Sequence, residues 1–265
     1  MIYAVGFVLL SLAAAIGLPL LCGFSLWWGI LIFLGMEALC HALFATLNWL
    51  PVRKVDRSKP LEELMPAGRE GVLRIDSLLC AYGGLVPQIT GAEKLPKTPY
   101  LLVCNHRSMY DPLMILLYLK DQNIGFVSKP SNMKIPMIGD IAYAAGFLAI
   151  DRENDREALK TILAAAGYLK KGLCNMAIFP EGTRTRTGKL QEFHAGSFKI
   201  AQRANAPVVV ACVRNTDKAS RRLFLRPTKV YLDILEVIPA EQVKAMSTHE
   251  LAEHSRALML EVLGE

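Results

Sequence analysis

The segment "NHRSMYD", residues 105–111, places an imidazole and a carboxylate five positions apart, directly after the apolar run "YLLVC". An imidazole can accept a proton near neutral pH, and a carboxylate can hold it in one orientation. On an α-helix five positions rotate by about 500°, so His106 and Asp111 would point about 140° apart. A turn between a strand and a helix can bring them together. The alternative is a surface histidine, with Asp111 as the N-cap of a helix that starts at Pro112.

A second polar segment, "FPEGTRTRTGKL" at residues 179–190, also follows an apolar run. Its glycines offer backbone N–H groups and its basic residues, Arg184 among them, offer positive charge, a combination that binds phosphate. It is not a nucleotide P-loop, because five residues separate Gly182 from Gly188 and Leu190 replaces the required Ser or Thr. Alone, this segment indicates either a phosphate-binding loop or a basic surface turn.

The first 52 residues are unusually apolar, because they contain no Lys or Arg and only one acidic residue, Glu37. Residues 2–22 form an uncharged run of 21 residues, long enough as a helix to cross a bilayer core of about 30 Å. Residues 24–50 form a second run, in which Trp27 and Trp49 suit two interfaces about 33 Å apart. These runs predict a pair of membrane helices.

Glu37 opposes a simple membrane-spanning arrangement. A charge near the middle of the bilayer costs about 2.5–3.5 kcal/mol unless it is protonated or pairs with a neighbour such as His41. The alternative is a helical pair that lies partly in the interface. Arg53, Lys54 and Arg57 follow the second run, so the positive-inside rule places the rest of the chain on the cytoplasmic face of the cell membrane in both arrangements.

Composition narrows the classes of ligand. The net charge is +6, the pI is about 9.0 and the mean hydropathy is +0.30. Basic residues lie beside apolar stretches, as in "RKVDRSK" at 53–59, which favours a lipid bilayer or a phosphate-bearing ligand over nucleic acid. The six cysteines lack CxxC spacing and indicate buried free thiols. No HExxH or zinc-ligand spacing occurs, so we predict no metal site.

From residue 99 onward, apolar runs alternate with helical patterns, which predicts an α/β fold: a single mixed-sheet domain flanked by helices. We divide the chain into a membrane-anchoring helical pair at 1–52, a connector at 53–84 with a helix near 71–81, and the α/β domain at 85–265. Strands are expected at 100–104, 124–128, 146–150, 174–179, 207–213 and 229–236.

Two capping boxes predict where helices begin in the α/β domain. "NDRE" at 154–157 precedes a helix over about 155–171, which ends at Gly172. "STHE" at 247–250 precedes the last helix.

The two polar segments together resemble the glycerolipid acyltransferase family, which includes 1-acylglycerol-3-phosphate acyltransferases. "NHRSMYD" fits the family's N-H-x4-D motif and "FPEGTRT" fits its F-P-E-G-T-R motif. "GFLAIDR" at 146–152 looks like the family strand that ends in a phosphate-binding arginine, and "APVVVACV" at 206–213 looks like its last apolar block. The lysine of "FVSKPS", Lys129, also fits. The resemblance covers about residues 85–215.

The resemblance implies a role for each matching residue. His106 would be the general base and Asp111 its orienting carboxylate, with Gly182 as a candidate oxyanion donor through its backbone N–H. Permanent positive charge for the acceptor phosphate would come from Arg152 and Arg184. The expected substrate-binding residues are Asn105, Lys129, Arg152, Glu181, Gly182, Thr183 and Arg184.

The implied activity is transfer of a fatty acyl group to the sn-2 hydroxyl of lysophosphatidic acid, giving phosphatidic acid. Acyl-CoA or acyl-carrier protein would be the donor substrate, and no cofactor is expected. The acceptor stays open to another lysophospholipid or a lyso-aminolipid. A lipid hydrolase or thioesterase is the alternative from a different class. The sequence has no G-x-S-x-G segment, and Ser108 lies inside the His-to-Asp span.

Overall fold

The computed structural model describes residues 2–23, 25, 27–185, 187–222 and 227–265, without the side chains of 220–222. Its centre is a seven-stranded mixed sheet in the order β1-β7-β6-β2-β5-β3-β4. All neighbouring strands are parallel except β6 and β7, which are antiparallel. The strands are β1 Leu85–Thr90, β2 Leu101–Cys104, β3 Ile124–Ser128, β4 Leu148–Ala149, β5 Asn175–Ile178, β6 Val208–Arg214 and β7 Thr228–Ile238. The predicted mixed α/β sheet is confirmed.

The sequence did not predict β1. Its sequence "LVPQIT" contains Pro87, which cannot donate a ladder hydrogen bond and is tolerated at sheet edges. β1 is such an edge, parallel to β7.

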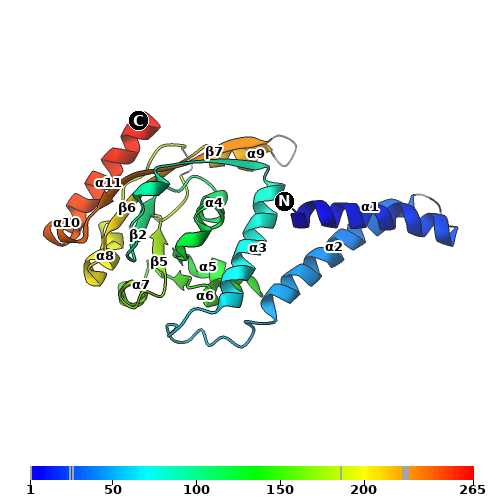
Figure 1. Cartoon of the computed structure of the whole chain (residues 1–265), viewed down its shortest axis with the longest axis horizontal. Helices are drawn as coiled ribbons and strands as arrows, with labels where there is room; N and C mark the ends of the chain where they lie inside the picture. The colour runs from blue at the N-terminus through cyan, green and yellow to red at the C-terminus, as the bar shows by residue number, and fades with distance from the viewer. Residues whose placement is uncertain (1, 24, 26, 186, 223–226) are drawn as a thin grey trace.

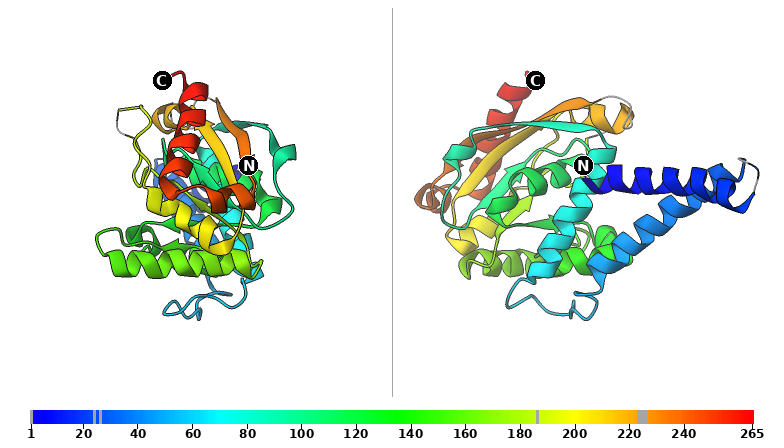
Figure 2. Two further views of the ribbon diagram at one scale, coloured as in Figure 1. Left: turned by 90° about the vertical axis from the view of Figure 1, so that its left-hand side faces the viewer. Right: turned by 45° about the vertical axis from the view of Figure 1, so that its right-hand side comes forward.

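Helices cover both faces of the sheet (Figures 1 and 2). Leu102 and Cys104 of β2 belong to a core shared with α3 Pro66–Tyr82, α4 Tyr110–Tyr118, α6 Ile138–Ala144 and α9 Thr216–Arg222. Leu101 and Val103 face a second core shared with α7 Asp155–Lys170, α8 Lys199–Ala204, α10 Ala240–Ala245 and α11 Thr248–Leu263. The remaining short elements are α5 Pro130–Met133, η1 Ala92–Lys94, η2 Lys120–Gln122 and η3 Ala195–Phe198.

The two predicted capping boxes differ in outcome. At α11, Ser247 and Glu250 make both reciprocal bonds, so that capping box is confirmed. At α7, the Asn154 side chain accepts from the backbone N–H of Glu157, but the Glu157 carboxylate pairs with Lys160 at 2.7 Å. Asn154 is nevertheless the N-cap of α7, at the predicted start of this helix.

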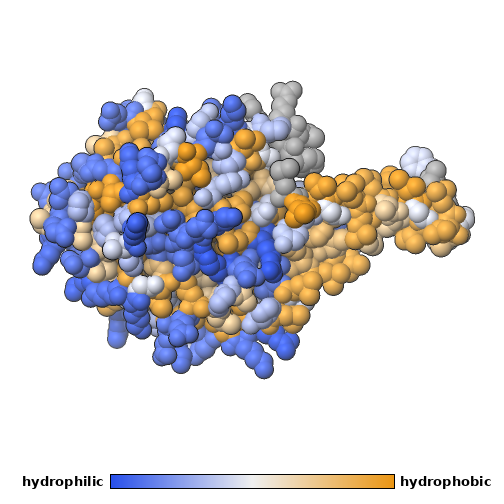
Figure 3. All heavy atoms as spheres, in the orientation of Figure 1, coloured by the Kyte–Doolittle hydropathy of each residue, from blue (hydrophilic) through white to orange (hydrophobic). Residues whose placement is uncertain are grey.

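The N-terminal helices α1, Ile2–Cys22, and α2, Trp28–Trp49, form a hairpin that projects from the α/β domain (Figure 1). Both are long and apolar enough to cross a membrane. The projecting surface is hydrophobic (Figure 3), and Leu20, Leu21 and Trp27 near its tip are 69, 84 and 81% exposed. In water this surface would be unfavourable, so the hairpin is suited to association with a membrane.

The second half of α2 is attached to the α/β domain. The Trp49 indole N–H donates to the Asp140 carboxylate of α6 at 2.8 Å, so this tryptophan contacts protein. His41 Nδ1 lies 3.6 Å from the Glu37 carboxylate, and its Nε2 lies 2.9 Å from the Tyr82 hydroxyl of α3. The predicted pairing of Glu37 with His41 is therefore present, and it continues into α3.

Candidate active site

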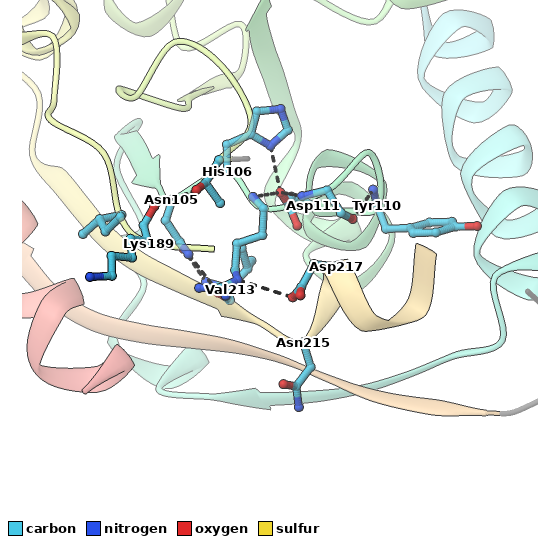
Figure 4. Close-up of polar contacts among 12 residues, drawn as sticks. Asn105, His106, Tyr110, Asp111, Lys189, Val213, Asn215 and Asp217 are labelled. Carbon is cyan, nitrogen blue, oxygen red and sulfur yellow. Dashed lines mark hydrogen bonds and ion pairs between the residues drawn. The ribbon is translucent and has the colours of Figure 1, made fainter. Parts of the chain in front are cut away.

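His106 and Asp111 meet in the turn between β2 and α4 (Figure 4). His106 Nδ1 lies 2.7 Å from Asp111 Oδ2. The Asp111 side chain is fully buried, whereas that of His106 is 18% exposed. The structure confirms that a turn brings the two side chains together.

The Asp111 carboxylate folds back onto this turn. Its Oδ2 also accepts hydrogen bonds from the backbone N–H groups of Arg107 at 2.6 Å and Ser108 at 2.7 Å. Since a carboxylate can only accept, His106 carries its proton on Nδ1 and leaves the Nε2 lone pair free. That is the tautomer that a general base requires.

The alternative interpretation of Asp111 as the N-cap of a helix starting at Pro112 is wrong. α4 begins at Tyr110 with Met109 at the N-cap position, so Asp111 lies in the first turn and the helix starts before Pro112. The proline is tolerated there because the first helical N–H groups have no partner within the helix.

The FPEG segment packs directly against His106. The Phe179 ring stacks on the imidazole, with 4.1 Å between centroids and 9° between planes. Glu181 Oε1 accepts from the His106 backbone N–H at 2.6 Å, and its Oε2 accepts from the Gln191 backbone N–H at 3.1 Å. The Thr185 N–H donates to the His106 carbonyl at 2.9 Å. These contacts fix the backbone of the base.

Glu181 was expected to position the acceptor, but its carboxylate is buried and bonded to backbone. Burial raises the pKa of Glu181, and the N–H donors oppose that rise. In this structure Glu181 joins the two motif segments. It positions His106.

Helix α11 holds the end of the same segment. Arg256 donates to the carbonyls of Gln191 at 3.0 Å and Leu190 at 3.3 Å. The Glu265 carboxylate accepts from the Leu190 N–H at 2.7 Å. The sequence predicts no role for Phe179, although it begins the F-P-E-G-T-R motif. It also predicts none for Gln191 and Arg256, which act through tertiary contacts and match no motif.

A cavity of about 360 Å³ opens beside His106. Its lining combines cationic and loop residues with many apolar side chains, and it includes His106. The polar and glycine lining comprises Asp76, His106, Ser128, Lys129, Asn132, Arg152, Gly182, Thr183 and Arg184. The apolar lining comprises Val72, Ile75, Leu79, Met109, Pro112, Leu113, Leu116, Phe126, Val127, Met133, Ile135, Ile138, Ile141, Ala142, Phe147 and Phe179. Such a cavity suits an amphiphile with an anionic head.

Arg152 comes close to the FPEG segment because residue 182 has no side chain. A Cβ at Gly182 would collide with the Arg152 guanidinium, and the residue adopts a left-handed φ of +79°. Desolvation lowers the pKa of Arg152, so an anion that replaces lost hydration would be favoured there. Within the described part of the chain, no ion pair engages Arg152, Arg184 or Lys129.

The expectation that the Gly182 N–H donates to an oxyanion is wrong for this conformation. That N–H donates to the Phe179 carbonyl at 3.0 Å, which closes a turn. Gly182 lines the cavity, and its contribution is the space it leaves for Arg152. Thr183 also lines the cavity and its carbonyl accepts from the Gln191 amide at 3.2 Å.

Asn105 and Ser108 hold the backbone near the site. The Asn105 amide is buried and makes two bonds to Val213 of β6, as donor at 2.9 Å and as acceptor at 2.7 Å (Figure 4). It is not among the residues that line the cavity. Ser108 is buried and its hydroxyl accepts from the Tyr110 N–H at 3.0 Å. This geometry gives Ser108 no access as a nucleophile.

Residues 86–214 match the family described as Acyltransferase. The 1-acyl-sn-glycerol-3-phosphate acyltransferase of Escherichia coli K12 is 31% identical over 176 residues, which cover 66% of this chain and 71% of that protein. The chain belongs to this acyltransferase family. The protein of the same name from Salmonella typhimurium is 32% identical over 165 residues, covering 62% of this chain and 67% of that one.

The fold of the family agrees with the structure. The crystal structure of the 1-acyl-sn-glycerophosphate acyltransferase from Thermotoga maritima superposes with a TM-score of 0.53 at 22% identity, covering 81% of this chain and 94% of that one. As a family member, the chain is an acyltransferase. Its predicted site residues form two groups. Those that line the cavity are His106, Lys129, Arg152, Gly182, Thr183 and Arg184. The other three do not line the cavity: Asp111 and Glu181 bond to His106, and Asn105 bonds to Val213.

Proposed function

We propose that this acyltransferase moves a fatty acyl group from acyl-CoA or acyl-carrier protein to the sn-2 hydroxyl of 1-acylglycerol-3-phosphate, and so forms phosphatidic acid at the cytoplasmic face of the cell membrane. The names of its relatives support this acceptor. The observation that carries the proposal is the His106–Asp111 pair on a cavity with both cationic and apolar walls. The thioester is already activated, so the reaction needs no cofactor.

The proposed reaction has one nucleophile, the acceptor hydroxyl. Its oxygen attacks the thioester carbonyl carbon while His106 Nε2 takes the hydroxyl proton. The C–S bond then breaks as the new C–O ester bond is completed, and the imidazolium gives the proton to the leaving thiolate. Asp111 stabilises the imidazolium without taking its proton. General-base catalysis of this kind contributes about 10²- to 10⁴-fold in rate.

Arg152 and Arg184 are proposed to bind the acceptor phosphate, and Lys129 lines the same cavity. A guanidinium matches phosphate in fork geometry and stays charged. The apolar walls suit the acyl chains. In this proposal the glycerol hydroxyl lies between the phosphate and the acyl chain, next to His106.

The experiment that tests the acceptor offers lysophosphatidic acid and lysophosphatidylcholine separately to the purified protein, with palmitoyl-CoA or palmitoyl-acyl-carrier protein. We expect phosphatidic acid as product. Arg152→Ala and Arg184→Ala should each raise KM for lysophosphatidic acid about 10- to 100-fold, because each removes a charge-assisted contact. Equal use of both acceptors would refute phosphate recognition, and free fatty acid alone would mean hydrolysis.

We propose that the tip of the α1–α2 hairpin inserts into one leaflet of the bilayer, because this tip is apolar. The other end of α2 is held against the α/β domain by the hydrogen bond from Trp49 to Asp140. Leu20→Glu combined with Leu21→Glu should reduce flotation with anionic vesicles, since both side chains are exposed at the tip. Leu159→Glu on α7, also exposed, is the matched control and should float normally. Undiminished flotation of the double variant would assign membrane binding to the α/β domain.

A further inference from the structure

A carboxyl group lies buried in the apolar wall of the cavity. Asp76, in the middle of α3, is 3% exposed and lines the cavity. Its Oδ2 has no hydrogen-bond partner among the described residues, and none of the ion pairs found there includes it. A buried polar group without a partner is unfavourable for folding. The mechanism described above does not use it.

The surroundings of Asp76 are apolar and favour the uncharged form of its carboxyl. Val72, Ile75 and Leu79 line the cavity beside it on α3, and Leu116 of α4 lines the same cavity. Burial in this setting raises the pKa of Asp76 well above its usual range. A protonated carboxyl offers one O–H donor and one carbonyl acceptor.

Asp76 lies at a distance along α3 from the start of α4. The C-terminal end of α3 contacts the first residue of α4, since a Cβ at Gly83 would lie 2.7 Å from Cζ of Tyr110. Asp76 is seven residues earlier, about 10 Å along the helix axis, and α3 continues toward α6 (Figure 1). Its carboxyl lines the cavity among apolar residues of α3, a kind of wall that suits an acyl chain. The phosphate end of the cavity is lined by other residues.

We propose that Asp76 is a specificity-determining residue that hydrogen-bonds a hydroxyl group carried on an acyl chain in the apolar part of the cavity. The inference rests on the proposed function, because it takes this part of the cavity as the acyl-chain site. A hydroxyl group both donates and accepts, so it satisfies both atoms of the carboxyl at once. An ester carbonyl accepts only and would leave one atom of Asp76 unpaired.

The hydroxylated chain has two sources, the thioester donor or the lysolipid acceptor. The test uses palmitoyl-CoA and a set of hydroxypalmitoyl-CoA thioesters that differ in hydroxyl position, each with plain lysophosphatidic acid. A second arm uses palmitoyl-CoA with lysophosphatidic acid whose own chain is plain or hydroxylated. The arm that shows the preference identifies the source.

We expect wild-type kcat/KM to be about tenfold higher for one hydroxylated chain than for the plain chain. Asp76→Asn keeps a donor and an acceptor and should keep this preference. Asp76→Leu removes both and should bring the ratio to about one. A purely structural role would not change the ratio. Equal wild-type rates on all chains in both arms, or a preference that survives in Asp76→Leu, would overturn the proposal.

Failure of the proposed function is distinguishable from failure of this inference. Transfer of plain chains without a hydroxyl preference leaves the function intact and removes the role of Asp76. If no acyl transfer occurs at all, the role of Asp76 can still be tested by thermal shift. The measurement compares the rise in melting temperature produced by free hydroxypalmitate with that produced by palmitate. The larger shift should come from hydroxypalmitate in wild type and Asp76→Asn only. Equal shifts in all three proteins would refute it.

Discussion

Replacing Asp111 by Asn should remove a charge while keeping the geometry of His106. The Asn oxygen can occupy the Oδ2 position and accept the same three hydrogen bonds, from His106 Nδ1 and the N–H groups of Arg107 and Ser108. The amide NH₂ then takes the Oδ1 position, which has no partner among the described residues. The imidazole tautomer therefore survives. What is lost is the anion that stabilises the imidazolium.

The size of this loss follows from Coulomb's law. At a separation of about 4 Å and an effective dielectric constant of about 20, the attraction is about 4 kcal/mol, equivalent to about 10³-fold in kcat. KM should stay close to the wild-type value because Asp111 does not line the cavity. The buried amide hydrogens without acceptors should lower the free energy of unfolding by about 1–3 kcal/mol.

The assay compares kcat, KM and urea unfolding for wild type, Asp111→Asn and Asp111→Ala. The Ala variant removes the acceptor of two backbone N–H groups as well, so it should be less stable than the Asn variant. A kcat for Asp111→Asn within about threefold of wild type would refute the charge argument. An effect confined to KM would place Asp111 in substrate binding instead.

Three further predictions follow from the contacts. Gly182→Ala should displace the Arg152 guanidinium and raise acceptor KM about tenfold in steady-state assays, with little change in kcat. Arg256→Gln should lower kcat a few-fold by loosening the Leu190–Gln191 segment, with acceptor KM unchanged. Because its folded-state pKa is raised, Asp76 keeps a proton that the unfolded chain releases above about pH 4. Wild-type stability should therefore fall with rising pH relative to Asp76→Asn, by up to about 1.4 kcal/mol per pH unit in urea titrations.

Buried strands were the part of the fold that the sequence predicted best. β2, β3 and β6 are almost wholly apolar because both their faces are covered by helices, and their bounds agree with prediction within a residue or two. β1 was missed because its polar positions and Pro87 resemble a connector. Its partner β7 lies about 140 residues further along the chain.

The motif residues lie in or beside one cavity, but the sequence did not predict all of their contacts. In the sequence, Asn105 and Glu181 are polar residues of the two motifs, which suggested that they contact the substrate. Their side chains instead bond to backbone brought close by folding, from Gln191 and Val213. Nothing in the local sequence encodes such tertiary partners.

Asp76 illustrates the same limit for burial. The sequence predicts a helix near 71–81, and a single Asp in a helix is usually exposed to solvent. It becomes buried because α4 and α6 pack against α3. Close packing with α6 depends on small residues at two positions, Gly68 against Ala144 and Gly71 against Ile141.

The most direct test of the central claim compares acyl transfer to lysophosphatidic acid by wild type, His106→Ala and His254→Ala. His254 lies on α11 and pairs with Glu236 at 3.1 Å, outside the cavity, so its variant is the matched control. We predict that His106→Ala forms phosphatidic acid about 10²- to 10⁴-fold more slowly at saturating substrate, while His254→Ala is unimpaired. Wild-type turnover by His106→Ala would contradict general-base catalysis by this residue.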